Sequence, residues 1–153
     1  MTVKAIVREQ YRRLVNNAGA YADQQTPPEG WVRTVRKALG MSGSQLARRM
    51  GVTRARIAQA EHAELSGGAT LRSMQAASEA MGCRFIYAIV PNKRIEDVIT
   101  AHARKKAMAL VGMASTHMAL EDQALSKDRI AQQVERLTQE MAREMPTDFW
   151  SDP

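Results

Sequence analysis

The sequence predicts an all-α protein with one short β-strand. Apolar residues recur at intervals of three and four along most of the 153 residues, which is the spacing of amphipathic helices. Only residues 85–90 have the aromatic and β-branched composition of a strand, and Pro91 follows them. Hydrophobic residues make up 44% of the chain, enough for a core. We therefore expect a central group of helices, one strand, and flanking helices at both ends.

The N-terminal segment predicts an amphipathic helix. Apolar residues at helical spacing run from position 3 to 15, and basic residues occupy the opposite face. The pattern ends near residues 16–19, and the sequence Thr-Pro-Pro-Glu-Gly at 26–30 is typical of a linker. Residues 1–29 are thus expected to form an N-terminal helix and its linker.

Residues 30–82 predict a compact domain of four short helices. Ser42 and Gln45 have the spacing of a capping box, in which each side chain bonds the other residue's backbone N–H. Gly51 permits a turn of only a few residues, and Thr53 can cap the helix that follows. Two helices are therefore expected to cross closely around residue 51.

Residues 83–91 are expected to contain the strand. An isolated strand cannot satisfy its own backbone groups, so it must pair with another segment. Self-pairing across a two-fold axis is one solution, and it would join two copies of the chain. The residues predicted to lie at this dimer contact are Phe85, Tyr87 and Ile89.

Residues 92–153 predict a C-terminal helical region. The apolar positions between 130 and 141 are spaced four, three and four, a short heptad-like seam. Two heptads are too few for an independent coiled coil, so the seam is expected to pack on the same chain or on a sister chain. The aromatic residues 149–150 predict either an anchor on the body of the protein or a partner contact.

Charge is concentrated in the first part of the chain. Residues 1–60 hold 11 Lys and Arg against 3 Asp and Glu, whereas the whole chain has a net charge of +6. Such a basic segment suits a surface that faces phosphates. The single cysteine, Cys83, excludes a disulfide within the chain. No signal peptide and no membrane-spanning segment are expected, since no apolar run approaches the length of about 20 residues that a bilayer requires.

The helix expected after Thr53 carries side chains suited to DNA recognition. Arginine can bind guanine with two hydrogen bonds, glutamine can bind adenine in the same way, and alanine can contact a thymine methyl group. We predict base readout by Arg54, Ala55 and Gln59. The residues predicted to contact phosphates are Ser42, Ser44, Gln45, Arg48, Arg49, Thr53 and Arg56.

The segment between positions 42 and 61 resembles the Cro/CI-like (XRE) family of helix-turn-helix proteins. The matching residues are Leu46-Ala47, Gly51-Val52-Thr53, Ile57 and Glu61. This resemblance implies that residues 54, 55 and 59 face base edges and that Arg36 pairs with Glu61. The chain departs from the family at Gly43, where many relatives have a glutamine that holds a phosphate.

A second resemblance covers nearly the whole chain and is to the family called mobile mystery protein A. It rests on Gly30-Trp31, residues 47–52, Gly82-Cys83-Arg84, residues 87–91 and above all residues 117–123. The resemblance implies a helix-turn-helix protein of mobile elements, encoded beside a Fic-domain protein, with the role of an antitoxin and autoregulator. No glutamate of this chain has a Ser or Thr four residues before it, so a Fic partner would be restrained differently from the usual inhibitory helix.

His117, Glu121 and Asp122 invite a metal or acid–base interpretation. His117 and Glu121 are four residues apart and would share a helix face, but two ligands do not make a site and no second His or Cys cluster supports them. We assign these three residues to contacts with a partner or between helices. No nucleophile–base pair or phosphate-binding glycine loop is present, so we expect neither an enzyme nor a cofactor.

The predicted function is a sequence-specific DNA-binding transcriptional regulator. We expect a homodimeric repressor of its own gene pair, located with the nucleoid in a bacterial cytoplasm, that places two helices about one duplex turn apart. The alternative is a protein-interaction module that binds and restrains a Fic-domain partner, with DNA binding secondary.

Overall fold

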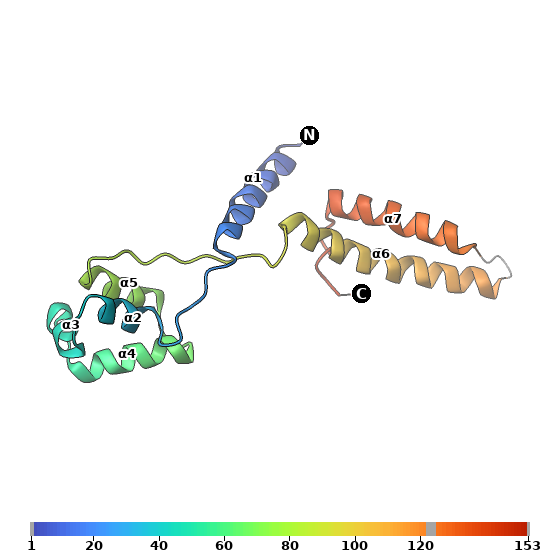
Figure 1. Cartoon of the computed structure of the whole chain (residues 1–153). Helices are drawn as coiled ribbons and strands as arrows, with labels where there is room; N and C mark the ends of the chain where they lie inside the picture. Colours follow the sequence, from blue (N-terminus) through green and yellow to red (C-terminus); the bar gives the residue numbers. More distant parts are fainter. Residues whose placement is uncertain (1, 122–124, 153) are drawn as a thin grey trace. The chain divides into compact units, whose positions relative to one another are not determined.

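A computed structural model describes residues 2–121 and 125–152, and these residues are predominantly helical (Figure 1). The fold class predicted from the sequence is confirmed as all-α. Among the described residues, no helix is both long and apolar enough to cross a membrane. The elements are α1 (Val3–Asn17), the 3-10 helix η1 (Ala18–Tyr21), α2 (Trp31–Ala38), α3 (Gly43–Met50), α4 (Arg54–Ser66), α5 (Leu71–Ala80), α6 (Ile95–Leu120) and α7 (Lys127–Glu144).

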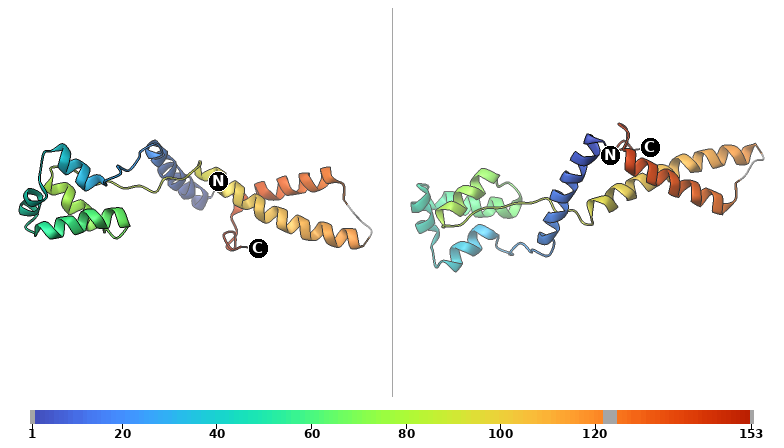
Figure 2. Two further views of the ribbon diagram at one scale, coloured as in Figure 1. Left: turned by 60° about the horizontal axis from the view of Figure 1, so that its bottom comes forward. Right: turned by 90° about the horizontal axis from the view of Figure 1, so that it is seen from above.

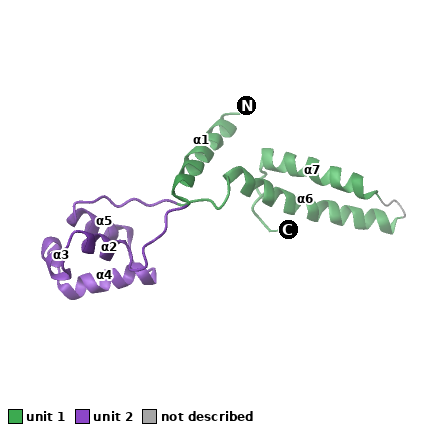
Figure 3. Cartoon of the chain, in the orientation of Figure 1, with its two compact units in different colours: residues 1–22, 89–153 green, residues 23–88 purple. Residues whose placement is uncertain are grey.

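The chain divides into two compact units (Figure 3). One consists of residues 23–88 and contains α2 to α5. The other consists of residues 1–22 and 89–153 and contains α1, α6 and α7. We describe each unit separately below.

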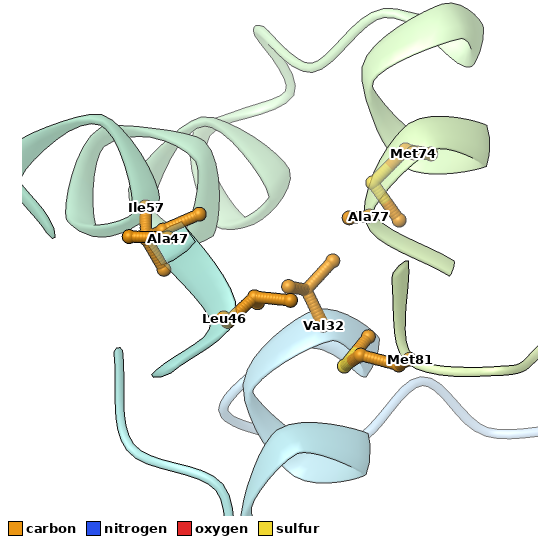
Figure 4. Packing of buried hydrophobic residues seen from close by; sticks show 7 residues of the cluster. All are labelled: Val32, Leu46, Ala47, Ile57, Met74, Ala77 and Met81. Atoms are coloured by element: carbon orange, nitrogen blue, oxygen red, sulfur yellow. The ribbon is translucent and has the colours of Figure 1, made fainter. Parts of the chain in front are cut away.

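Unit 23–88 is built around a small apolar core to which all four of its helices contribute (Figure 4). Leu46 is fully buried, and Ala47 and Ile57 are each 3% exposed. Small Ala47 lets α3 approach α4 closely. The members of this core are Val32, Leu46, Ala47, Ile57, Met74, Ala77 and Met81.

Local signals define the ends of α3 and α4. The predicted capping box is confirmed, because Ser42 Oγ accepts from Gln45 N–H at 3.1 Å and Gln45 Oε1 accepts from Ser42 N–H at 2.7 Å. Gly51 ends α3 in the left-handed conformation with φ of 68°, which an L-residue adopts only at a cost. Thr53 then caps α4, and its hydroxyl oxygen accepts from Arg56 N–H at 3.2 Å.

In the other unit, α6 and α7 lie side by side as an antiparallel pair (Figure 2). The side of α6 that faces α7 is made of small and β-branched residues spaced four apart: Ile99, Ala103, Ala107 and Val111. Phe149 of the C-terminal tail is 1% exposed and joins the core of this pair, while Trp150 stacks on His102. The tail is thus an anchor on the body of the unit.

Helix α1 meets α6 at Asn16, which lies in the last turn of α1. Asn16 Oδ1 accepts from Ile95 N–H at 2.9 Å, and the Asn16 amide donates to both oxygens of Glu96 at 3.0 and 3.2 Å. Since Arg94, the residue before α6, forms no side-chain cap, Asn16 supplies that cap from another helix. The hydrogen bond from Asn16 lowers the pKa of the Glu96 carboxyl below its ordinary value.

The strand predicted at residues 85–90 is wrong. In the described residues this segment has neither helical nor strand hydrogen bonding and runs as an extended connection from α5 to α6 (Figure 1). A strand requires a partner strand, and composition alone does not supply one. Phe85 packs against the core of unit 23–88, whereas Tyr87 is 71% and Ile89 is 90% exposed.

Candidate nucleic-acid interface

The candidate interface is the outer surface of α3, its turn and α4. On its inner side this helix pair is packed into the core through Leu46, Ala47 and Ile57, which are buried. Because the buried residues fix the rotation of α4 about its axis, the opposite side of the helix is turned toward solvent. The turn at Gly51-Val52 is exposed as well.

The three side chains predicted to contact bases all lie exposed on α4: Arg54, Ala55 and Gln59. Ala55 and Gln59 are four residues apart and therefore share one face of the helix. His62 follows Gln59 by three residues and is also exposed, so it extends the same face by nearly one turn. His62 was not among the residues predicted to contact DNA, although its spacing from Gln59 is a signal for that position.

The seven residues predicted to contact phosphates are all on or beside this surface, although Ser42, Gln45 and Thr53 already use their side chains as helix caps. Arg49 Nε donates to the carbonyl oxygen of Ala80 at 2.7 Å, which ties α3 to the end of α5. These four side chains therefore help to build the surface, and each keeps a donor for a phosphate, since the hydroxyl hydrogens of Ser42 and Thr53, the Gln45 amide and the Nη groups of Arg49 take no part in these bonds.

The other three residues predicted to contact phosphates, Arg48, Arg56 and Ser44, neither cap a helix nor tie two helices together. All three are exposed, and no side-chain hydrogen bond or ion pair involves them within the described part of the chain. Arginine side chains on this surface are thus available for an external anion. Between positions 42 and 60 the chain has four arginines and no acidic residue, so the surface is strongly basic.

Glu61 of the same unit is turned inward and paired with an arginine. Arg36 Nε donates to Glu61 Oε1 at 2.7 Å, Arg36 Nη2 donates to Glu61 Oε2 at 3.3 Å, and Arg36 Nη1 donates to the carbonyl oxygen of Met41 at 3.0 Å. The two side chains are only 13% and 12% exposed. This two-pronged ion pair, which the XRE resemblance implied, joins α2 to α4.

Glu64 has a structural role that the sequence analysis missed. Its carboxylate accepts from the backbone N–H groups of Trp31 and Val32, the latter at 3.0 Å. These are the first two residues of α2, and the preceding Gly30 has no side chain to cap them. Gly30 has φ of 82°, and a Cβ at this position would lie 2.8 Å from the Glu64 carboxylate. Glycine before the helix thus indicated that a cap must come from elsewhere.

Glu29 is paired with Lys37 on the surface of the same unit. Lys37 Nζ donates to both carboxylate oxygens at 3.0 and 2.9 Å. This hydrogen bond lowers the pKa of Glu29 below its ordinary value. The negative charge of Glu29 is therefore balanced locally and subtracts little from the basic surface of α3 and α4.

The residues predicted to contact a partner are dispersed. His117 is exposed in the last turn of α6, Glu121 is exposed directly after the helix, and Asp122 lies outside the described residues. Among the described side chains, no group of three or more His, Cys, Asp or Glu could hold a metal ion. Tyr87 and Ile89 are exposed in the connection between the two units.

Comparison with known families gives one match. Residues 32–87 match the family described as "Helix-turn-helix". The matched segment begins in α2 and ends after α5, so it contains the whole basic surface described above. This match supports a DNA-binding regulator of the XRE type. Neither the curated proteins nor the solved structures that were compared gave a match to the chain.

Proposed function

We propose that this protein is a sequence-specific transcriptional regulator that inserts α4 into the major groove of DNA. The observation that carries the proposal is the exposed face of α4, on which Arg54, Ala55 and Gln59 lie beside the exposed side chains of Arg48 and Arg56. A helix fits the width of the major groove, and these three side-chain types can distinguish base pairs there.

We further propose that the regulator is a homodimer that represses its own gene pair. A helix-turn-helix dimer binds two half-sites about one duplex turn apart, so the operator is expected to be two-fold symmetric. The resemblance to the mobile mystery protein A family supports an antitoxin role on a mobile element. Because its ligand would be chromosomal DNA, we place the protein with the nucleoid in the cytoplasm.

Selection of bound fragments from random duplex DNA tests this function directly. We expect one enriched motif made of two inverted half-sites. On that operator, Arg54→Ala should weaken binding by roughly 1–3 kcal/mol and relax the preference at one base pair. Arg48→Ala is the matched control, since the loss of a phosphate contact should weaken binding to all sequences equally and reduce the salt dependence of binding. Absence of any enriched motif would refute sequence-specific recognition.

One observation favours a second function, the restraint of a protein partner. Helix α1 contains no buried residue, and Val3, Tyr11 and Leu14 are between 65% and 77% exposed. DNA does not cover apolar side chains of this kind, whereas a protein such as a Fic-domain enzyme could. Co-purification with the product of the neighbouring gene tests this role. It is separable from DNA binding, because Arg54→Ala should leave the co-purification unchanged.

A further inference from the structure

Helix α6 has a second apolar face in addition to the one that α7 covers. Leu110, Met113 and Leu120 are 49%, 65% and 80% exposed, and His117 between them is also exposed. Intervals of three, four and three residues place these four side chains along one stripe of the helix. The side packed against α7 is a different one and includes Val111, which is 6% exposed. The stripe is therefore not part of the α6–α7 contact.

We propose that a second copy of this chain covers the stripe, with the two α6 helices antiparallel about a two-fold axis. The proposal identifies a contact surface for the homodimer proposed above, and it rests on that part of the proposed function. It also gives the dimer a contact that does not depend on residues 85–90, which form no strand in the described chain.

The intervals between the residues of the stripe are the same in both directions along the helix. Read from either end, the intervals between residues 110, 113, 117 and 120 are three, four and three. In an antiparallel pair centred on residue 115, Leu110 would face Leu120 of the second copy and Met113 would face His117. All four positions would then be used on both copies, as a two-fold contact requires.

Charge at the two ends of the stripe favours the same arrangement. Arg104 and Lys105 on α6 are paired with Glu135 and Asp152, whereas Lys106 donates only to the carbonyl oxygen of Asp148 and has no acidic partner in the described chain. Lys106 precedes Leu110 by four residues, and Glu121 follows Leu120. An antiparallel pair brings the basic end of one helix near the acidic end of the other, whereas a parallel pair would bring like charges together. The observed order of charges thus selects against the parallel alternative.

The strength of the contact follows from its length. The stripe spans less than two heptads and is short for a coiled coil, so we expect self-association in the micromolar range rather than an obligate dimer. Sedimentation equilibrium of the full chain without DNA, at concentrations up to about 100 μM, would measure such a dissociation constant. Omitting DNA separates this test from the test of operator recognition, and Arg54→Ala should self-associate like the original protein.

The first test compares two substitutions on the same helix. Leu110→Glu places a charge on the stripe and should raise the dissociation constant at least about ten-fold. Met108→Glu is the matched control, because Met108 is 59% exposed but lies two residues away and hence on another face. A monomeric original protein, or an equal effect of the two substitutions, would overturn the proposal.

The second test determines orientation and guards against a folding defect. Leu110→Lys and Leu120→Glu should each weaken self-association, and the double variant should recover it. The recovery requires an antiparallel pair, in which residue 110 of one copy faces residue 120 of the other. A double variant that associates no better than the worse single variant would overturn the proposed arrangement.

Discussion

Removing the Glu61 carboxylate should destabilise unit 23–88 strongly. The pair with Arg36 is nearly buried, and Glu61→Ala would leave a guanidinium group that is only 13% exposed with Met41 as its remaining acceptor. Breaking a buried ion pair from one side costs about 3–5 kcal/mol. Because the Met41 hydrogen bond survives and some water reaches the site, we expect about 2–3 kcal/mol. For a unit of this size that corresponds to a fall in Tm of roughly 10–20 °C.

Thermal and urea unfolding followed by the fluorescence of Trp31 would measure this loss. Trp150 belongs to the other unit, so a Trp150→Phe background makes Trp31 the sole tryptophan reporter. Glu79→Ala is the control, since Glu79 is an exposed carboxylate on α5 that accepts from Gln75 on the surface. If Glu61→Ala lowers the Tm and the urea midpoint no more than the control does, then the Arg36–Glu61 ion pair does not stabilise the unit as we infer.

Three further predictions concern single contacts. Gly30→Ala should cost about 2–4 kcal/mol, because its Cβ would displace the Glu64 cap and strain the backbone, and urea unfolding measures it. The lowered pKa of Glu96 means that its bond to Asn16 stabilises the protein above the unfolded-state pKa and is lost as pH falls through the folded-state value. Amide exchange in α1, corrected for intrinsic rates, should therefore quicken from about pH 6 to about pH 3. Phe149→Ala should cost about 3–5 kcal/mol in the α6–α7 pair, seen as faster exchange in α6.

Elements set by contacts within a few residues could be predicted from the sequence. The capping box at Ser42, the turn at Gly51 and the cap at Thr53 each depend on neighbours along the chain, and the structure confirms all three. The helical spacing of apolar residues likewise predicted the helices of both units. Short-range hydrogen bonds and periodicity are visible in a single sequence because they need no knowledge of the tertiary arrangement.

Contacts between distant residues could not be predicted in this way. Glu64 and Asn16 each complete the N-terminus of another helix, and nothing near them in sequence reveals the partner. The error at residues 85–90 has a related cause, since strand formation depends on a second segment that composition does not specify. For Phe149 the sequence did not distinguish an anchor from a partner contact, because the environment of this side chain depends on how α6 and α7 pack.

The carboxylate that caps the N-terminus of α2 belongs to a residue that is translated after α2. Glu64 lies 33 residues after Trp31, so α2 leaves the ribosome with its first amides uncapped and with Gly30 unable to help. A helix of eight residues does not persist alone in water. We therefore expect α2 to become ordered only when α4 has been translated and has docked, so α2 is translated before α4 but does not fold before it.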